Sequence, residues 1–394
     1  MRHWSEEQRS LRAAVEKVGA AIGADHLERD GAGEFTWDGW ARLRDMGLFG
    51  LPFATEWGGL GQDLPTTMYV LEGLGHSCRD AGLTFSVSTH IVSTGVPLQR
   101  FGSTALKQRY LPGICSGTLI GAHAITEPDG GSDVMGMRTT AVADGEDFLL
   151  SGSKAFVSNG PIADLLVVYA RTGTAGALDA LTAFLVPTDT PGLTVGNPVG
   201  KMGLRTSPLS EVFLDGVRVA RSQVLGSVGS GFLILDEVMK WEILCGFSGT
   251  LGEMCHRLER CVDHARTRTQ FGVHIGANQA VSHRIVDMKM DVETSRKWLY
   301  DTAEKFTARE SVVSDLAIAK LVVSEANVRS ALAAVQIFGG AGYTTEYGIE
   351  KELRNAVSGT IYSGTSEMQR QRLAVFLGLD RASAARGGQE KRTA

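Results

Sequence analysis

A glycine-rich segment at residues 126–133 (TEPDGGSD) combines hydroxyl and acidic side chains with two adjacent glycines. Glycines let a backbone approach a ligand closely, and the flanking hydroxyls can donate or accept hydrogen bonds. Loops of this kind can hold a phosphate or the polar edge of a heterocycle through exposed N–H groups. The same pattern fits a plain turn between two elements, so this segment alone leaves both interpretations open.

A second segment, residues 154–160 (KAFVSNG), has the alternation of a strand. That alternation places Phe156 and Ser158 on one face, where the aromatic ring can pack on a flat ligand and the hydroxyl can bond its edge. The alternative is a half-buried strand that runs into an Asn-Gly turn.

Three further segments offer ligand contacts nearer the carboxyl terminus. Residues 268–272 (RTQFG) follow a helical pattern, and Arg268 suits bidentate contact with phosphate, although Arg266 and Arg268 could simply complement a helix dipole. Residues 336–343 (QIFGGAGY) fit a glycine helix stop. Residues 361–367 (IYSGTSE) fit the start of a helix, with Thr365 or Ser366 as its N-cap.

The elements that must position these segments change twice along the chain. Apolar residues recur at helical spacing through about residue 120, strand-like runs separated by turn signals follow to about 228, and long helical patterns then resume. We therefore predict an α+β chain with a helical domain, a small antiparallel sandwich or barrel and a helical bundle, at 1–120, 121–228 and 229–380, and a disordered polar tail at 381–394. The clearest single patterns are a helix at 37–46, helical runs at 68–74, 84–101 and 281–292, and strands at 148–152, 165–169, 181–186 and 211–214.

Composition excludes several classes of function. The 394 residues carry a formal net charge of −5 and no long basic block, which argues against nucleic acid as the main partner. The amino terminus lacks an apolar signal region, and no apolar run approaches the length of a membrane helix. The five cysteines are scattered without C-x-x-C spacing, so we expect neither a metal site nor a disulfide framework. Reduced cysteines are typical of the cytoplasm, so we expect a cytoplasmic location.

Taken together, and in this order, the segments resemble the acyl-CoA dehydrogenase family from about residue 6 to residue 379. The motifs that carry the resemblance are AITEP at 124–128, RTQFG at 268–272, QIFGG at 336–340 and GTSE at 364–367. The resemblance implies a helical amino-terminal domain, a middle antiparallel β domain and a carboxyl-terminal four-helix bundle. It also implies FAD as cofactor, held between the last two domains.

The resemblance assigns roles to particular positions. Thr126 would bond the pyrimidine edge of the flavin, Phe156 would flank its ring where Trp is usual, and Ser158 would reach N5 where Thr is usual. Gly131 and Ser132 would lie near the phosphate-bearing arm, with Ser132 also near the substrate. The remaining predicted cofactor contacts, most of them to the FAD of a neighbouring subunit, are Arg268, Gln270, Phe271, Gln279, Gln336, Gly339, Gly340, Thr365 and Glu367. A cofactor shared between chains implies a homo-oligomer, usually a tetramer built as a dimer of dimers.

The chain departs from the family pattern at the catalytic base. Many relatives carry a glutamate just before the Gly-Thr pair, where this sequence has Ser363. In some members the base instead projects from the first long helix of the bundle, a position that corresponds to Glu242. Steps of three and four from Glu242 reach mainly apolar or small residues, which places one acid in an apolar stripe. The alternative for Glu242 is a structural pairing with a basic residue across the bundle.

The predicted activity is FAD-dependent α,β-dehydrogenation of an acyl thioester. Glu242 would take the α-proton, flavin N5 would take the hydride, and backbone N–H groups near Ser363 and Gly364 would bind the thioester carbonyl. Many relatives have Arg after the catalytic Glu where this chain has Ile243, and CDRAGL at 78–83, NQAVSHRI at 278–285 and YSGT at 362–365 resemble a biosynthetic branch. That branch oxidises acyl or aminoacyl groups on carrier proteins in secondary metabolism, as prolyl-carrier-protein dehydrogenases do.

Several alternatives remain open at this point. Electron-transfer flavoprotein or a similar acceptor is the expected electron acceptor of the dehydrogenase. The carrier could be CoA, in an ordinary dehydrogenase of short or branched chains. The same scaffold could serve a flavin oxidase or hydroxylase. A flavin-binding homologue that has lost catalysis is the non-enzymatic alternative.

Overall fold

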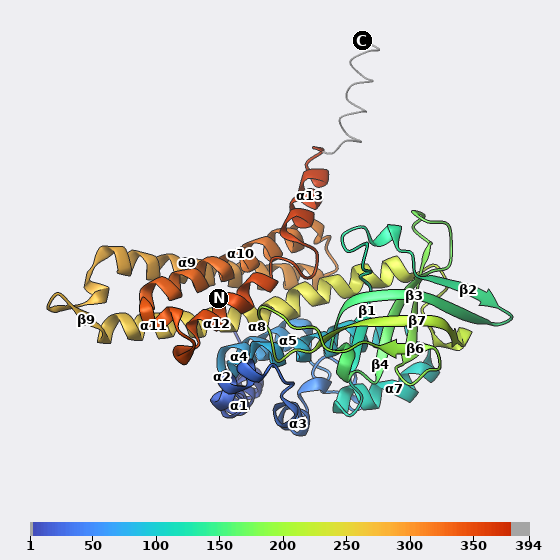
Figure 1. Cartoon of the computed structure of the whole chain (residues 1–394), viewed down its shortest axis with the longest axis horizontal. Helices are drawn as coiled ribbons and strands as arrows, with labels where there is room; N and C mark the ends of the chain where they lie inside the picture. Colours follow the sequence, from blue (N-terminus) through green and yellow to red (C-terminus); the bar gives the residue numbers. More distant parts are fainter. Residues whose placement is uncertain (1–2, 380–394) are drawn as a thin grey trace, which may run out of the picture. The chain divides into compact units, whose positions relative to one another are not determined.

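The amino-terminal part of the computed structural model is helical, as the spacing of its apolar residues predicts (Figure 1). The structure describes residues 3–379 and divides into one unit that ends at Glu253 and a second that begins at Met254. Helix α1 (Glu6–Ile22) starts with a capping box, in which Ser5 and Gln8 satisfy each other's backbone N–H groups. The helices that follow are α2 (His26–Ala32), α3 (Trp37–Asp45), α4 (Leu64–Cys78), α5 (Ala81–Thr89), α6 (Val96–Phe101) and α7 (Thr104–Ser116).

The helical run predicted at 84–101 contains a wider turn. Helices α5 and α6 are joined by a π-helical segment, His90–Gly95. The His90 ring is fully buried, and its Nδ1 accepts from the backbone N–H of Gly121 at 3.0 Å, while its Nε2 lies 2.9 Å from the Ile114 carbonyl oxygen. This imidazole joins the helices to the first strand of the sheet.

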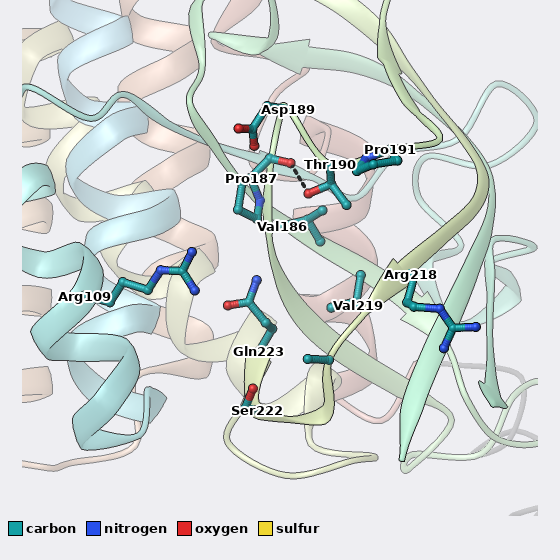
Figure 2. Close-up of a pocket in the computed structure, with 11 residues that line it drawn as sticks. Arg109, Val186, Pro187, Asp189, Thr190, Pro191, Arg218, Val219, Ser222 and Gln223 are labelled. Carbon is teal, nitrogen blue, oxygen red and sulfur yellow. Dashed lines mark hydrogen bonds between the residues drawn. The ribbon is translucent and has the colours of Figure 1, made fainter. Parts of the chain in front are cut away.

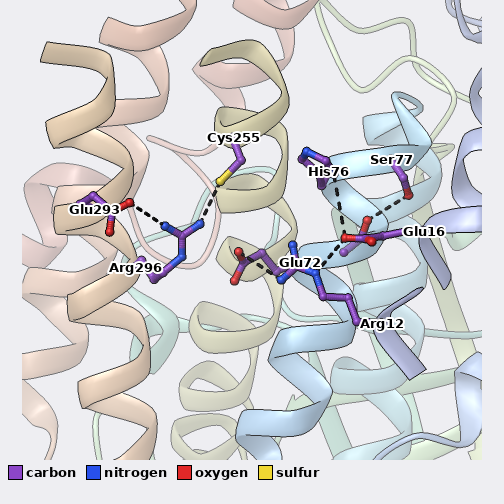
Figure 3. A network of polar contacts seen from close by, with 9 residues as sticks. Arg12, Glu16, Glu72, His76, Ser77, Cys255, Glu293 and Arg296 are labelled. Carbon is purple, nitrogen blue, oxygen red and sulfur yellow. Dashed lines mark hydrogen bonds and ion pairs between the residues drawn. The ribbon is translucent and has the colours of Figure 1, made fainter. Parts of the chain in front are cut away.

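A buried acid ties α1 to α4. Glu72 lies 3.4 Å from Arg12 Nη1, and Arg12 Nε also donates to Glu16 at 2.8 Å (Figure 3). The Arg12 guanidinium lies 4.6 Å from the ring centroid of Tyr69. The buried carboxylate therefore has its counter-charge on the neighbouring helix, as buried acids require.

The predicted strand region forms one eight-stranded sheet. Its order is β6-β7-β3-β2-β4-β5-β8, and β1 pairs with β4. The pairs are antiparallel except β1–β4 and β2–β4, which are parallel. The strands are β1 (Gly121–Ala124), β2 (Thr140–Asp144), β3 (Asp147–Ser158), β4 (Leu165–Arg171), β5 (Leu181–Pro187), β6 (Leu193–Val195), β7 (Leu209–Val219) and β8 (Val224–Leu225).

Strand β4 is covered on both faces. Leu166, Val168 and Ala170 point into the main core of the sheet, whereas the alternate residues Val167 and Tyr169 are equally buried on the other face. Burial on both faces explains the continuous apolar run at 165–170. The second face lies toward helix α8 (Gly231–Thr267), whose Glu242 approaches β1.

Helices α4 and α8 touch backbone to backbone. A Cβ added at Gly75 would lie 2.0 Å from the Gly249 carbonyl oxygen, and one at Gly252 would lie 2.1 Å from the Glu72 carbonyl oxygen. Any larger residue at these positions would force the helices apart. The glycines therefore set the spacing between α4 and the half of α8 that carries Glu242.

The second unit is helical. Its core joins Cys261 of α8, Met288 of α9, Ala334 and Ile337 of α10 and Ile349 of α12. The elements are a short hairpin of β9 (Thr269–Gln270) and β10 (Val273–His274), then α9 (Gln279–Thr307), α10 (Val313–Phe338), α11 (Gly340–Tyr343), α12 (Ile349–Ser358) and α13 (Ser366–Phe376). The predicted tail at 381–394 lies outside the described residues.

Helix α10 packs against α9, α12 and α13. By length and composition alone it is the one helix within residues 3–379 that could cross a membrane, a test that core helices of soluble proteins also pass. It buries Lys320, Ser324 and Asn327, polar residues that favour its position within the bundle.

Candidate functional site

One buried carboxylate fixes the glycine-rich segment at 126–133. Glu127 accepts from the backbone N–H groups of Arg138 at 2.7 Å and Thr139 at 2.8 Å, and from Lys154 Nζ at 3.0 Å. Lys154 is fully buried on β3 and also donates to the Ile125 carbonyl oxygen at 3.0 Å. Burial lowers the pKa of Lys154 to about 8, against the opposing charge of Glu127. Burial alone would raise the pKa of Glu127, but the N–H donors and Lys154 lower it overall.

Glu127 and Lys154 lie within the motifs TEPDGGSD and KAFVSNG, but the sequence pattern assigns a role to neither. The lysine within the strand pattern could have indicated the pair, because a lysine is buried in a strand only when an acceptor or a counter-charge lies beside it. The pair holds the loop against β3, and the Ala155 N–H donates to the Thr126 carbonyl oxygen at 2.8 Å. The structure thus brings the Thr126 and Phe156 segments together, as a shared ligand would require.

The glycines of the loop are not required by packing within the chain. A Cβ added at Gly131 would come no closer than 3.8 Å to any atom, the nearest being Thr126 Cγ2, and Gly130 is similarly open. Gly131 and Ser132 are exposed. Their small size leaves room for a group from outside the chain.

Phe156 stands at a bulge in β3. The register with β7 shifts between Lys154 and Val157, and Phe156 has a φ of 55° and is 67% exposed. A left-handed phenylalanine is strained, and here the strain holds an aromatic ring at the surface. Val157 points into the core and Ser158 is half-buried, and the shared face of Phe156 and Ser158 remains a prediction, because the bulge interrupts the alternation on which it was based. An open ring, a hydroxyl and uncrowded glycines fit the FAD that the resemblance implies.

Glu242 lies on α8 against the second face of the sheet. Leu235, Val238 and Cys245 of its stripe are buried, and its own side chain is 16% exposed. Its Oε2 lies 3.8 Å from Nε2 of His123 on β1. Burial lowers the pKa of His123 and the charge of Glu242 offsets this only in part, so the imidazole is neutral near pH 7. A basic group beside Glu242 is therefore a neutral ring on a strand.

A second group of predicted residues gathers at one end of the second unit. The His264 ring stacks on Phe338 at 4.1 Å between centroids, which joins the end of α8 to the end of α10. The Arg268 N–H bonds the His264 carbonyl oxygen, and the Ile275 N–H bonds that of Arg268. The side chains or backbones left exposed there are those of Arg268, Gln270, Phe271, Gln279, Gln336, Gly339 and Gly340.

Residues at this end of the second unit are open to contact from outside the chain. Phe271 is fully exposed with a φ of 51°, at the tip of the β9–β10 hairpin. A Cβ at Gly339 or Gly340 would meet nothing within 4 Å. The neighbourhood is consistent with contacts to a cofactor held by another chain, which remains a prediction.

The segment 361–367 forms a strained turn followed by a capped helix. Ser363 and Gly364 have φ values of 54° and 81°, and Gln369 Nε2 donates to the Ser363 carbonyl oxygen at 3.0 Å. Thr365 is the N-cap of α13, since its hydroxyl accepts from the Met368 N–H at 3.2 Å. Glu367 lies exposed in the first turn, where backbone N–H groups and Thr365 lower its pKa. The capping role of Thr365 is confirmed, and its predicted cofactor contact remains a prediction, as does that of Glu367.

A pocket of about 440 Å³ lies elsewhere in the first unit (Figure 2). It is lined in part by Arg109, Arg218 and Gln223, and the Thr190 hydroxyl donates to the Pro187 carbonyl oxygen at its rim at 2.7 Å. Arg218 already pairs with Asp144 and Asp147. The pocket is lined by none of the predicted site residues.

Comparison with known proteins agrees with this arrangement. Family models for acyl-CoA dehydrogenases match residues 5–118 (N-terminal domain), 122–217 (middle domain) and 229–378 (C-terminal domain). An L-prolyl-[peptidyl-carrier protein] dehydrogenase from Pseudomonas fluorescens is 39% identical over 357 residues, which cover 90% of this chain and 92% of that protein.

Two solved structures are also similar. The prolyl acyl carrier protein oxidase AnaB has a TM-score of 0.93 at 37% identity and covers 96% of this chain and 100% of its own. PigA with FAD and proline has a TM-score of 0.93 at 34% identity, with coverage of 96% and 99%.

Proposed function

The chain belongs to the acyl-CoA dehydrogenase family, and from that premise we propose that it desaturates a short acyl or aminoacyl thioester carried by a carrier protein, with Glu242 as the base. The family makes it an FAD-dependent oxidoreductase that acts on CH–CH groups. The observation that carries the finer proposal is a single acid in an apolar stripe, 16% exposed and facing the sheet.

The reaction needs a base for the α-proton. Ser363, at the position where many relatives carry glutamate, has a hydroxyl that is too weak a base to act alone. The Glu242 carboxylate stands among buried apolar residues, where water competes little for it. Bound FAD supplies the acceptor for the hydride that leaves the β-carbon. Backbone N–H groups near Ser363 and Gly364 would bind the thioester oxygen, where negative charge develops.

A carrier-protein substrate is favoured over CoA by the relatives. The Pseudomonas protein and AnaB are both named for prolyl groups on carrier proteins. Ile243, which follows Glu242, is buried, so this position supplies no charge for a CoA ester. An ordinary acyl-CoA dehydrogenase of short or branched chains remains the second substrate class.

Further parts of the proposal concern partners and place. The exposed group around Phe271 supports a homo-oligomer, a dimer of dimers, in which each chain contacts its neighbour's FAD. Electron-transfer flavoprotein is the proposed acceptor. We also propose a cytoplasmic location and a role in secondary metabolism.

The substrate test is a screen by intact mass. Carrier proteins loaded with prolyl or short acyl groups, and a set of acyl-CoAs, are incubated with the enzyme, and loss of two hydrogen atoms marks the substrate. Substitution Glu242→Gln should lower the rate of desaturation by about 10²–10⁴-fold while FAD stays bound. Asp236→Asn, on an exposed position of the same helix, is the matched control. A Glu242→Gln enzyme with normal activity contradicts the assignment of the base.

An oxidase is the second candidate, because AnaB is described as an oxidase. After anaerobic reduction by substrate, admission of oxygen separates the two functions. Rapid reoxidation of the flavin favours an oxidase, and slow reoxidation with fast transfer to electron-transfer flavoprotein favours a dehydrogenase. Failure of every thioester to bleach the flavin would favour a non-catalytic homologue.

A further inference from the structure

The face of the sheet beside Glu242 carries two polar rings. His123 of β1 pairs in parallel register with Val167 of β4, so strand alternation places His123, Val167 and Tyr169 on one face. The neighbours of His123 along β1, Ala122 and Ala124, point into the main core. His123 therefore faces α8, where its Nε2 lies 3.8 Å from Glu242 Oε2.

Both rings have polar atoms that packing alone does not explain. His123 Nδ1 and the Tyr169 hydroxyl are buried and have no hydrogen-bond partner among residues 3–379. An apolar side chain would be cheaper at each position, since a buried polar atom without a partner opposes folding. Their placement beside a carboxylate points to a task other than stability.

The charge states of the rings suit that task. Burial, and then the charge of Glu242, raise the pKa of Tyr169, so the phenol keeps its proton. Burial keeps His123 neutral near pH 7. Of the other titratable groups on elements that pack against β1, His90 bonds Gly121 and Ile114, and Lys154 bonds Ile125 and Glu127. Arg171, at the far end of β4, shares the face of Tyr169 by strand alternation, and its buried Nε has no hydrogen-bond partner among residues 3–379. A neutral N–H that points at Glu242 would favour its ionised form without cancelling its charge.

We propose that His123 is a positioning residue for Glu242, which rests on the proposed function of that acid as the base. The imidazole Nε2–H holds one carboxylate oxygen toward β1 and leaves the other for the substrate's α-proton. Closing the 3.8 Å separation to a hydrogen bond requires only a small side-chain shift. Catalytic contacts of this kind are often long in the free enzyme and shorten in the complex.

Two substitutions at His123 separate its donor from its shape. His123→Phe keeps a ring but removes the donor, so kcat should fall about 10- to 100-fold with little change in KM. The acidic limb of the kcat–pH profile should also move to higher pH, because the carboxylate loses a group that favours ionisation. His123→Gln carries an amide N–H near the position of Nε2 and should recover most of the rate and the original limb.

His90→Gln is the matched control, since it changes another buried imidazole that contacts β1. It should lower thermal stability without moving the acidic limb. His123→Phe with the wild-type rate and limb would overturn the proposal, as would His123→Gln that is as impaired as His123→Phe. If His123→Phe yields no folded flavoprotein, the position of the acidic limb in the kcat–pH profile of His123→Gln decides instead. Glu242→Gln is assayed alongside, because its activity tests the base itself and so distinguishes failure of the proposed function from failure of this one.

Discussion

Two fully buried lysines, one in each unit, show how differently the units satisfy their polar groups. Lys154 donates to the Ile125 carbonyl oxygen and to Glu127, each at 3.0 Å. Lys320 of α10 has no hydrogen-bond acceptor among the described residues. Burial lowers the pKa of each to about 8, although nearby acids oppose it in both cases. The two lysines thus end at similar pKa values, but only Lys154 has acceptors within the described chain that oppose its desolvation.

The two units also differ in how their predicted cofactor-binding residues are covered. In the first unit the loop at 126–133, which is predicted to bind the flavin, is held by contacts that the chain makes with itself. In the second unit the residues that are predicted to contact a neighbour's FAD are exposed, and Phe271 is fully exposed. This contrast is what the proposed homo-oligomer would produce, because a neighbouring chain and its FAD would then cover the exposed residues of the second unit.

The largest effect should come from breaking the pair in the first unit. Lys154→Met leaves the buried Glu127 carboxylate without its cation and should reduce the free energy of unfolding by about 3–5 kcal/mol, measured by denaturant titration. The double change with Glu127→Gln should cost less than Lys154→Met. Arg138→Ala, which removes an exposed ion pair with Asp129 on the same loop, should cost only about 0–1 kcal/mol. Equal losses for the two single variants would contradict the distinction.

At Lys320 the same substitution should have the opposite effect on the free energy of unfolding. Lys320→Met removes a buried amine that has no acceptor among the described residues. The substitution should raise the free energy of unfolding by about 1–3 kcal/mol when the protein is dilute enough to be monomeric. Because the folded pKa is about 8 and the unfolded value is 10.5, the unfolded chain binds more protons between these values. The free energy of unfolding should therefore rise with pH from about 8 to 10.5, and Lys320→Met should reduce that rise.

The control for Lys320 is Lys305→Met, at a half-buried lysine that is paired with Asp301 and Asp315. It should change stability by about 0–1 kcal/mol and leave the pH dependence above 8 intact. Denaturant titrations at several pH values measure both variants. A Lys320→Met chain that is less stable when dilute would mean that the lysine has an acceptor inside the folded chain.

The smallest effect on stability should follow Phe271→Ala. The side chain is fully exposed, so the free energy of unfolding should change by less than about 0.5 kcal/mol. If Phe271 contacts the FAD of a neighbour, the affinity for FAD should nevertheless fall about 10-fold, measured by titration of the apoprotein, and light scattering should show weaker assembly. Unchanged FAD affinity and unchanged assembly would remove Phe271 from the predicted cofactor site.

Much of the fold could be predicted because it depends on local periodicity. The helix at 37–46 and the strands at 165–169 and 181–186 follow from apolar spacing, and a helix cap at Thr365 or Ser366 follows from the neighbouring residues alone. The apolar stripe around Glu242 is also a property of one helix. These features need no knowledge of what packs against them.

Other features could not be predicted because their cause is remote in sequence. His123 meets Glu242 only because β1 pairs with β4 and α8 lies against that face. The positive φ of Phe156 arises from a register shift between β3 and β7, which strand alternation does not reveal. The π-helical turn at His90 likewise depends on a bond to the backbone of Gly121.

The contact between Gly75 and Gly249 has a consequence for how activity can drift among variants of this protein. Gly249 follows Glu242 by two helical turns on the same rigid rod, so the distance between α4 and α8 also governs how far the carboxylate stands from β1. A methyl group added at Gly75 would displace Glu242 by moving the helix that carries it, although neither Gly75 nor Gly249 is among the residues predicted to contact the cofactor or the thioester. Loss of activity in a variant of this chain is thus no guide to where its substitution lies.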